Sequence, residues 1–194
     1  MKNTNILLLY TDRYYLVKQI YPFGLDLIAD YLRQHGYRVT LEYSFLPDPD
    51  PERNLVNILK RDRPDVIGLG IRNLDTCLSC EPYGDYGGEH FRTFYFLPEI
   101  KKMVNLIKVH SPDVPIIAGG GGFTISPQAI LGYLDIEYGI TGEGEEPFRE
   151  FVEAFPDREK ILGISGLAYR SAGGFRVNPR KAYSFTEGAF SNGR

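Results

Sequence analysis

Short apolar runs of strand type alternate with longer amphipathic stretches along most of this chain. Such alternation is typical of a parallel sheet whose strands are joined by crossover helices. The predicted strands are residues 5–10, 37–43, 65–71, 114–118 and 137–141. The predicted helices are residues 23–35, 52–62, 127–134 and 145–154, with one more that ends at His110. The sequence therefore predicts an α/β fold with five parallel strands and helices on both faces of the sheet.

Past residue 161 the alternation of strand-type runs and amphipathic stretches stops. Two short strand-like runs, 166–170 and 175–178, flank a Gly173-Gly174 turn, which predicts a β-hairpin attached to the sheet as an appendage. The last stretch has scattered aromatic residues without a period. We therefore expect a main domain over residues 1–165, a hairpin over 166–178, and a linker toward a further domain over 179–194.

Composition argues against several classes of function. The 22 Lys and Arg residues nearly balance the 25 Asp and Glu residues, and the formal net charge of −3 does not suit a nucleic-acid binder. No apolar run approaches the roughly 20 residues of a membrane span, and Asp12 and Arg13 end the first run too early for a secretory signal. Two cysteines cannot form a disulfide framework. We expect a cytoplasmic protein with no nucleic-acid or membrane partner.

The unusual residues gather in the segments that leave the predicted strands. Segments that enter strands are short, whereas those that leave them carry most of the glycines, the loop aromatics and both cysteines. In an open parallel sheet, ligands bind beyond the carboxyl ends of the strands. We therefore expect a binding face at that edge, although long loops are also compatible with a docking surface.

Four consecutive glycines, Gly119, Gly120, Gly121 and Gly122, are the most informative local feature. Without Cβ atoms they allow a large flat ligand to approach the backbone, and they equally allow a tight turn with no ligand. Neither GxGxxG nor GxxxxGK[ST] occurs at these glycines, so a phosphate cradle is poorly supported. The later turn Gly142-Glu143-Gly144-Glu145 places carboxylates at a helix start that a phosphate would otherwise use.

A separate hypothesis concerns Cys77 and Cys80. Their CxxC spacing is that of a redox pair and of half a zinc site, and His90 is a candidate third ligand. The sequence shows no fourth ligand. A redox or zinc-linked module therefore stays open beside the alternative of two ordinary thiols in a loop.

Five motifs together resemble the N-terminal cobalamin-binding domain of cobalamin-dependent radical S-adenosylmethionine (SAM) enzymes. They are PFGLDLIADYL at 22–32 with HGYRV at 35–39, GLGIRNLD at 68–75, IAGGGGF at 117–123, YGITGEGEE at 138–146 and GLAYR at 166–170. The likeness runs from Asn5 to about Asn178 and follows the family's order and spacing. It implies a flavodoxin-like, or Rossmann-like, sheet over residues 1–165 that holds cobalamin at its carboxyl edge.

The resemblance also implies which residues bind the cofactor. The segments 119–122 and 142–144 would surround the nucleotide tail of cobalamin, and Thr11 and Asp12 would lie near the corrin ring. Arg72 or Asn73 would cover the lower face of cobalt, and we favour Arg72 because a guanidinium has no lone pair to ligate the metal. An ion pair between Arg72 and Asp75 is the alternative interpretation. The remaining residues assigned to cofactor binding on the same basis are Asp75, Phe123 and Glu143.

Two departures from the family's motifs shape the expected function. CxxxCxxC is missing, so the [4Fe-4S] cluster that cleaves SAM, and SAM itself, would be bound by a downstream radical SAM domain in the same polypeptide. DxHxxG is also missing: Asp12 is present, but the histidine that ligates cobalt is not. The resemblance therefore implies that this chain holds base-off cobalamin without a His ligand, for methyl transfer or related radical chemistry in that domain.

No residue of this chain stands out as catalytic, because no Ser, His and Asp arrangement or carboxylate pair is evident. The main competing hypothesis is a flavodoxin-like interaction domain that has kept the fold and lost its cofactor. The two hypotheses differ in whether the chain retains cobalamin.

Overall fold

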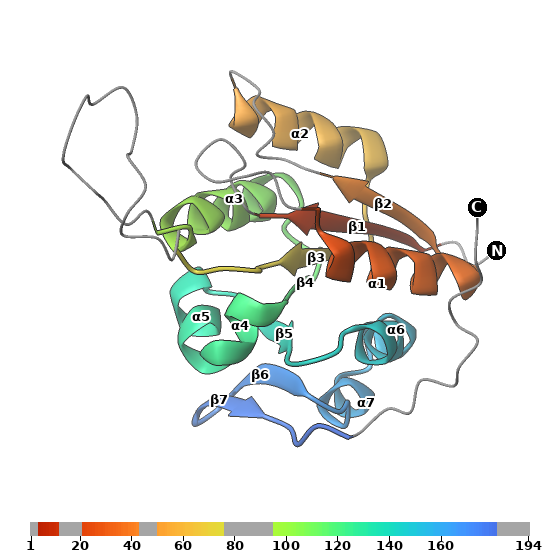
Figure 1. The fold of residues 1–194 in the computed structure, drawn as a ribbon, viewed down its shortest axis with the longest axis vertical. Helices are drawn as coiled ribbons and strands as arrows, with labels where there is room; N and C mark the ends of the chain where they lie inside the picture. Colours follow the sequence, from red (N-terminus) through yellow and green to blue (C-terminus); the bar gives the residue numbers. More distant parts are fainter. Residues whose placement is uncertain (1–3, 12–20, 43–49, 76–94, 182–194) are drawn as a thin grey trace.

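The computed structural model describes residues 4–11, 21–42, 50–75 and 95–181, which contain one seven-stranded sheet (Figure 1). Its strands are β1 (Asn5–Tyr10), β2 (Arg38–Glu42), β3 (Val66–Gly70), β4 (Ile116–Gly119), β5 (Tyr138–Ile140), β6 (Leu167–Ser171) and β7 (Gly174–Val177). The order across the sheet is β2-β1-β3-β4-β5-β6-β7. The first five strands are parallel to one another, as the alternating pattern predicts, and their order is flavodoxin-like.

The C-terminal hairpin differs from its prediction in its turn and in its pairing. The turn is Ala172-Gly173, because Gly174, predicted as a turn residue, is the first residue of β7. β6 pairs antiparallel with β5, and β7 pairs antiparallel with β6, so the predicted appendage is a continuation of the main sheet by two strands. Leu167 and Ala168 of β6 are fully buried. They cover the edge of β5, which would otherwise present unpaired backbone groups. The sheet is therefore mixed, with five parallel strands followed by two antiparallel ones.

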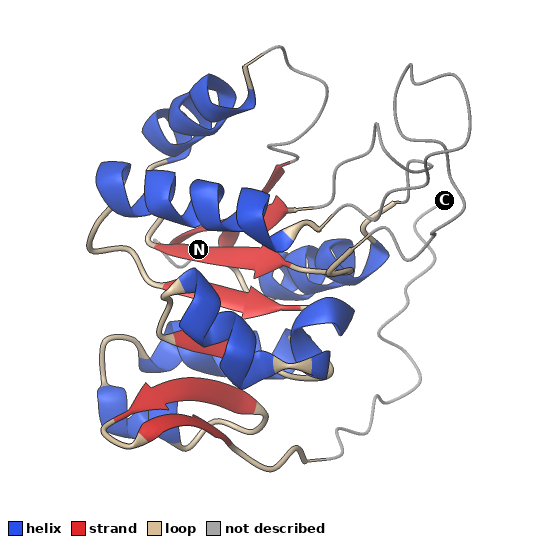
Figure 2. Cartoon of the chain, turned by 90° about the vertical axis from the view of Figure 1, so that its left-hand side faces the viewer, coloured by secondary structure: helices blue, strands red, loops and turns tan. Residues whose placement is uncertain are grey.

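Helices cover both faces of this sheet (Figures 1 and 2). They are α1 (Phe23–Gln34), α2 (Pro51–Asp62), α3 (Leu97–His110), α4 (Gly121–Ile125), α5 (Pro127–Leu134), α6 (Glu145–Ala154) and α7 (Arg158–Leu162). Buried residues of α1, α6 and α7 pack on one face, and those of α2, α3, α4 and α5 pack on the other. The amphipathic pattern does not predict α4 and α7, because five residues make barely more than one helical turn.

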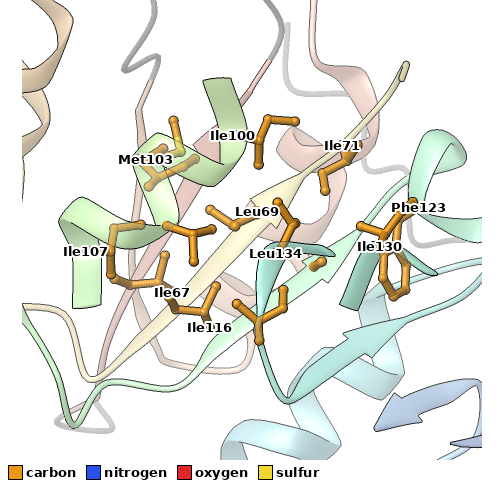
Figure 3. Packing of buried hydrophobic residues seen from close by; sticks show 14 of the residues in the cluster. Ile67, Leu69, Ile71, Ile100, Met103, Ile107, Ile116, Phe123, Ile130 and Leu134 are labelled. Carbon is orange, nitrogen blue, oxygen red and sulfur yellow. The ribbon is translucent and has the colours of Figure 1, made fainter. Parts of the chain in front are cut away.

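Alternation along the strands divides the core into two layers. Leu7 and Leu9 of β1 join the layer beneath α2, α3 and α5, whereas Ile6 and Leu8 join the layer beneath α1 and α6. Figure 3 shows the first layer, in which side chains of β3 such as Leu69 pack against α3 and α5. Both faces of the central strands are apolar, as expected of a sheet that is covered on both sides.

Local signals set several helix boundaries. Asp50 caps α2, because its carboxylate accepts a hydrogen bond from the backbone N–H of Arg53 at 2.9 Å. Gly36, just after α1, has a φ of 86°, as predicted for a glycine that ends a helix. Ser126 precedes α5 as predicted, but its side chain makes no capping hydrogen bond. None of the described helices is long and apolar enough to cross a membrane.

Candidate functional site

The strand order changes direction between β1 and β3. The chain moves from β1 outward to β2 by way of α1, and then crosses back to β3 by way of α2 on the other face of the sheet. Crossovers on opposite faces leave a crevice at the carboxyl ends of the two central strands, and open α/β sheets bind ligands there. Tyr10 and Gly70 are paired in register and end β1 and β3 at this point.

A cavity of about 700 Å³ lies in this crevice. Its volume falls within the range of about 300–1,000 Å³ that is usual for small-molecule and cofactor sites. It is lined by Leu8, Tyr10, Tyr21, Pro22, Phe23, Gly24, Leu25, Ile28, Gly68, Leu69, Gly70, Arg72, Ile117, Ala118, Gly119, Gly120, Gly121, Thr124, Ile140, Gly142, Glu143, Gly144, Glu145 and Phe148. The wall is therefore mainly aliphatic, aromatic or bare backbone, with few polar side chains.

Two glycines let α1 lie close to the cavity. A Cβ atom on Gly70 would lie 2.1 Å from Leu25 Cδ1, and one on Gly144 would lie 2.8 Å from Ile28 Cδ1. Atoms do not pack at such distances, so Leu25 and Ile28 occupy the space that side chains at positions 70 and 144 would need. The side of the cavity formed by α1 is consequently apolar.

The four glycines divide into two pairs that differ in the space around them. Gly120 has φ 98° and ψ 175°, a conformation open only to glycine, and a Cβ there would lie 2.6 Å from the carbonyl oxygen of Ile71. A Cβ on Gly122 would lie 3.0 Å from the carbonyl oxygen of Arg72. In contrast, Gly119 and Gly121 line the cavity and leave room for a Cβ, with nearest atoms at 3.6 and 3.5 Å. A tight turn explains the first pair, and the second pair presents bare backbone to the cavity.

Thr124 joins the two glycine loops. Its hydroxyl donates a hydrogen bond to the carbonyl oxygen of Gly120 at 3.0 Å and accepts one from the backbone N–H of Gly142 at 3.1 Å. Gly142 has a φ of 79°, so the second loop also depends on glycine. The sequence gives no signal for Thr124, because the two loops become neighbours only through the pairing of β4 with β5.

The binding residues implied by the resemblance fall into three groups. Those that line the cavity are Arg72, Gly119, Gly120, Gly121, Gly142, Glu143 and Gly144. Those that are described but do not line it are Thr11, Asn73, Asp75, Gly122 and Phe123. Asp12 lies outside the described residues, as do Cys77, Cys80 and His90 of the redox or zinc hypothesis. Within the described part of the chain, no three His, Cys, Asp or Glu side chains gather as a metal site.

Phe123 belongs to the core. Its side chain is fully buried, and a Cβ on Gly139 would lie 2.1 Å from ring atom Cζ, so the ring fills the space beside that glycine. Figure 3 shows Phe123 in the core cluster together with Ile130 of α5. Its position next to the glycine run suggests a ligand contact, but the short helix α4 turns the ring onto the sheet. Thr11 is also buried, and its hydroxyl donates to the carbonyl oxygen of Gly70 at 2.9 Å.

A polar network connects α1 to α6, which both begin at the cavity. Tyr31 of α1 donates a hydrogen bond to Glu146 of α6, while Arg149 pairs with Glu146 and, at 2.7 Å, with Glu153. The Arg149 guanidinium holds the pKa of Glu146 below its usual value, although burial acts in the opposite direction. Burial raises the pKa of Tyr31. Both shifts favour an ionised Glu146 and a protonated Tyr31, which are the states in which the phenol donates to the carboxylate.

Comparison with known proteins gives a consistent result. No protein-family model matches the chain. The chain is 27% identical over 151 residues to the tryptophan 2-C-methyltransferase of Streptomyces laurentii. That match includes 76% of this chain but only 23% of the methyltransferase.

Solved structures show a similar likeness. TsrM from Kitasatospora setae, a radical SAM methyltransferase, matches 91% of this chain with a TM-score of 0.76 and 25% identity. A structure of TsrM with cobalamin and a [4Fe-4S] cluster bound matches 96% of this chain, with a TM-score of 0.75 and 24% identity. OxsB, a cobalamin-dependent SAM radical enzyme solved with aqua-cobalamin and SAM, shares the fold over 93% of this chain at a TM-score of 0.67 and 16% identity.

These matches cover most of this chain but only a small part of each matched enzyme. The chain spans 30% of TsrM and 22% of OxsB, so most of each enzyme has no counterpart in it. The likeness was expected from motifs in five separate segments, and it covers more than nine-tenths of the chain. This chain therefore resembles, in sequence and in fold, one part of the cobalamin-dependent radical SAM enzymes, as its motifs predict.

Proposed function

We propose that this chain is a cobalamin-binding module that holds base-off cobalamin for a radical SAM domain in the same polypeptide, which carries out methyl transfer or related radical chemistry. The observation that carries the proposal is the apolar cavity of about 700 Å³ at the carboxyl ends of the parallel strands. Folds of this kind bind cofactors at that point. TsrM, which matches 96% of this chain, has been solved with cobalamin bound.

The lining fits cobalamin better than a ligand held by a phosphate. The nucleotide tail of cobalamin ends in a flat, apolar benzimidazole, which suits the mainly apolar lining of the cavity. Bare backbone at positions 119 and 121 allows a large group to come close. Glu145 is the first residue of α6 and Glu143 lies two residues before it, so their carboxylates repel a terminal phosphate group from the positive end of that helix. The phosphodiester in the nucleotide tail of cobalamin would therefore lie away from these two carboxylates.

We assign Arg72 to the lower face of cobalt. It lies two residues after the end of β3, is exposed, and lines the cavity. A guanidinium stays protonated, so it shields the metal without ligating it. His35 and His110 stand at the far ends of α1 and α3, which run back toward the opposite edge of the sheet, and this supports a cofactor with no ligand from either histidine. When bound, cobalamin supplies the cobalt that carries a methyl group, and the chain positions it.

Retention of hydroxocobalamin tests the proposal. The purified chain is mixed with hydroxocobalamin, desalted, and its visible spectrum is recorded against a blank. We expect retained absorbance with a base-off shape. No retained absorbance, either in this chain or in the polypeptide that includes the radical SAM domain, would refute the proposal and favour the interaction domain that has lost its cofactor.

The role of Arg72 is tested by the same measurement. Arg72→Ala should change the spectrum of bound cobalamin, because solvent gains access to the lower face of the metal. Arg176→Ala is the control, since Arg176 is exposed on β7 and does not line the cavity. If both variants give the wild-type spectrum, Arg72 does not cover the cobalt.

A further inference from the structure

Glu145 is the first residue of α6, and it lines the cavity. Among the described residues, its Oε2 is the one buried side-chain oxygen or nitrogen that lacks a hydrogen-bond partner. Buried polar groups in native proteins are nearly always paired, so such an exception points to a partner from outside the chain. The neighbouring Glu146 shows the contrast, because Tyr31 and Arg149 both donate to its carboxylate.

The surroundings of Glu145 define what that partner must be. The side chains of Leu25, Ile28 and Phe148 line the same cavity and offer no hydrogen-bond donor. Ile28 Cδ1 reaches the space next to Gly144, directly before Glu145. The N-terminal end of α6 favours a negative charge, but this dipole does not replace a hydrogen bond to Oε2. Because an ionised carboxylate only accepts hydrogen bonds, the missing partner is a donor.

We propose that Glu145 accepts, through Oε2, a hydrogen bond from an amide N–H of bound cobalamin. The assignment rests on the proposed function. The corrin ring carries primary amides along its edge, and a primary amide presents two N–H donors. An anionic group in the same place would face the carboxylates of Glu143 and Glu145. Glu145 is therefore a specificity-determining residue that selects an amide over a carboxylate of the same shape.

Two substitutions and one control measure the contribution of Glu145 to binding. Glu145→Leu should weaken the binding of hydroxocobalamin at least about tenfold in equilibrium dialysis, because a hydrogen bond to a charged group is lost. Glu145→Gln keeps an acceptor oxygen and should lose less. Glu150→Gln is the matched control, since Glu150 lies on the same helix and does not line the cavity. It should bind as the wild type does.

Thermal unfolding of the cofactor-free chain separates a binding role from a structural one. Glu145→Leu removes a half-buried carboxylate whose Oε2 is buried without a partner, so its unfolding temperature should equal or exceed that of the wild type while its affinity falls. A fall in unfolding temperature together with affinity would instead show that Glu145 is needed for the fold. Affinity equal to that of Glu150→Gln would also overturn the assignment.

Selectivity gives a second, independent readout. In cobalamin monocarboxylic acids, one side-chain amide is hydrolysed to a carboxylic acid. The wild-type chain should bind at least one of these isomers about tenfold more weakly than intact hydroxocobalamin. In Glu145→Gln, the ratio of the two affinities should be closer to one. An unchanged ratio would remove Glu145 from the contact. If the wild-type chain binds no cobalamin at all, the proposed function itself fails, and the wild-type measurement alone reveals it.

Discussion

Replacing Gly120 with alanine should destabilise the fold even when no ligand is present. The backbone at Gly120 has φ 98° and ψ 175°, and this conformation costs a non-glycine residue about 1–3 kcal/mol. The new Cβ would also lie 2.6 Å from the carbonyl oxygen of Ile71, which no side-chain rotation can move away. That oxygen accepts the N–H of Gly122 at 3.0 Å, so shifting it disturbs the turn. We therefore expect a loss near the upper end of the range, about 3 kcal/mol.

Gly121→Ala is the matched control. The nearest atom to a Cβ at this position is the carbonyl oxygen of Arg72 at 3.5 Å, an ordinary contact distance. Gly121 begins α4, where alanine is favoured over glycine by up to about 1 kcal/mol. The free energy of unfolding should therefore change little or rise.

Thermal unfolding without cobalamin distinguishes the two variants. In a domain of this size, each kcal/mol shifts Tm by about 2–4 °C, so Gly120→Ala should unfold about 6–12 °C below the wild type. Gly121→Ala should stay within a few degrees of the wild type. Equal Tm values for both variants would refute the strain argument and leave ligand contact as the explanation for Gly120.

Two further predictions concern packing and pH. The pKa of Glu146 lies below its usual value of 4.5. Its ion pair with Arg149 therefore stabilises the fold above that pH, and this stabilisation is lost as the pH falls through the lowered pKa. In acid unfolding followed by circular dichroism, the stability of Glu146→Gln should therefore depend less steeply on pH than that of the wild type. An unchanged profile would contradict a stabilising ion pair between Glu146 and Arg149. Gly139→Ala should cost about 1–3 kcal/mol because its Cβ meets the ring of Phe123, and Phe123→Leu should relieve part of that loss. Additive losses in the denaturant midpoints of the double variant would show that the two positions are not coupled.

Much of the architecture could be predicted from the sequence because its signals are local. Apolar runs and amphipathic periods of ten or more residues identify the parallel strands and the longer helices, and α6 begins and ends at the predicted residues, Glu145 and Ala154. Glycines in positive-φ conformations, such as Gly36, mark turns that the sequence also indicates. The edge of the sheet that bears the cavity follows from the same information, because parallel strands place all of their carboxyl ends on one side.

The remaining features depend on contacts between segments that are distant in sequence. The pairing of β6 with β5 is decided by the buried side chains of Leu167 and Ala168, whose hairpin pattern says nothing about the neighbouring strand. The ring of Phe123 enters the core only because Gly139 leaves space for it on another strand. Thr124 becomes a link between two loops for the same reason. No local pattern carries information of this kind.

The extension of the sheet by the hairpin determines where the chain leaves the domain. β6 runs away from the edge that bears the cavity, and β7 returns to it. There, the N–H of Lys181 donates to Ser165 Oγ at 2.7 Å, and the Arg180 side chain lies beside Gly142. A domain tethered after this point would meet the cavity at an effective concentration in the millimolar range expected for a short flexible linker. Separating the two parts would turn a fast intramolecular encounter into a bimolecular one that depends on protein concentration.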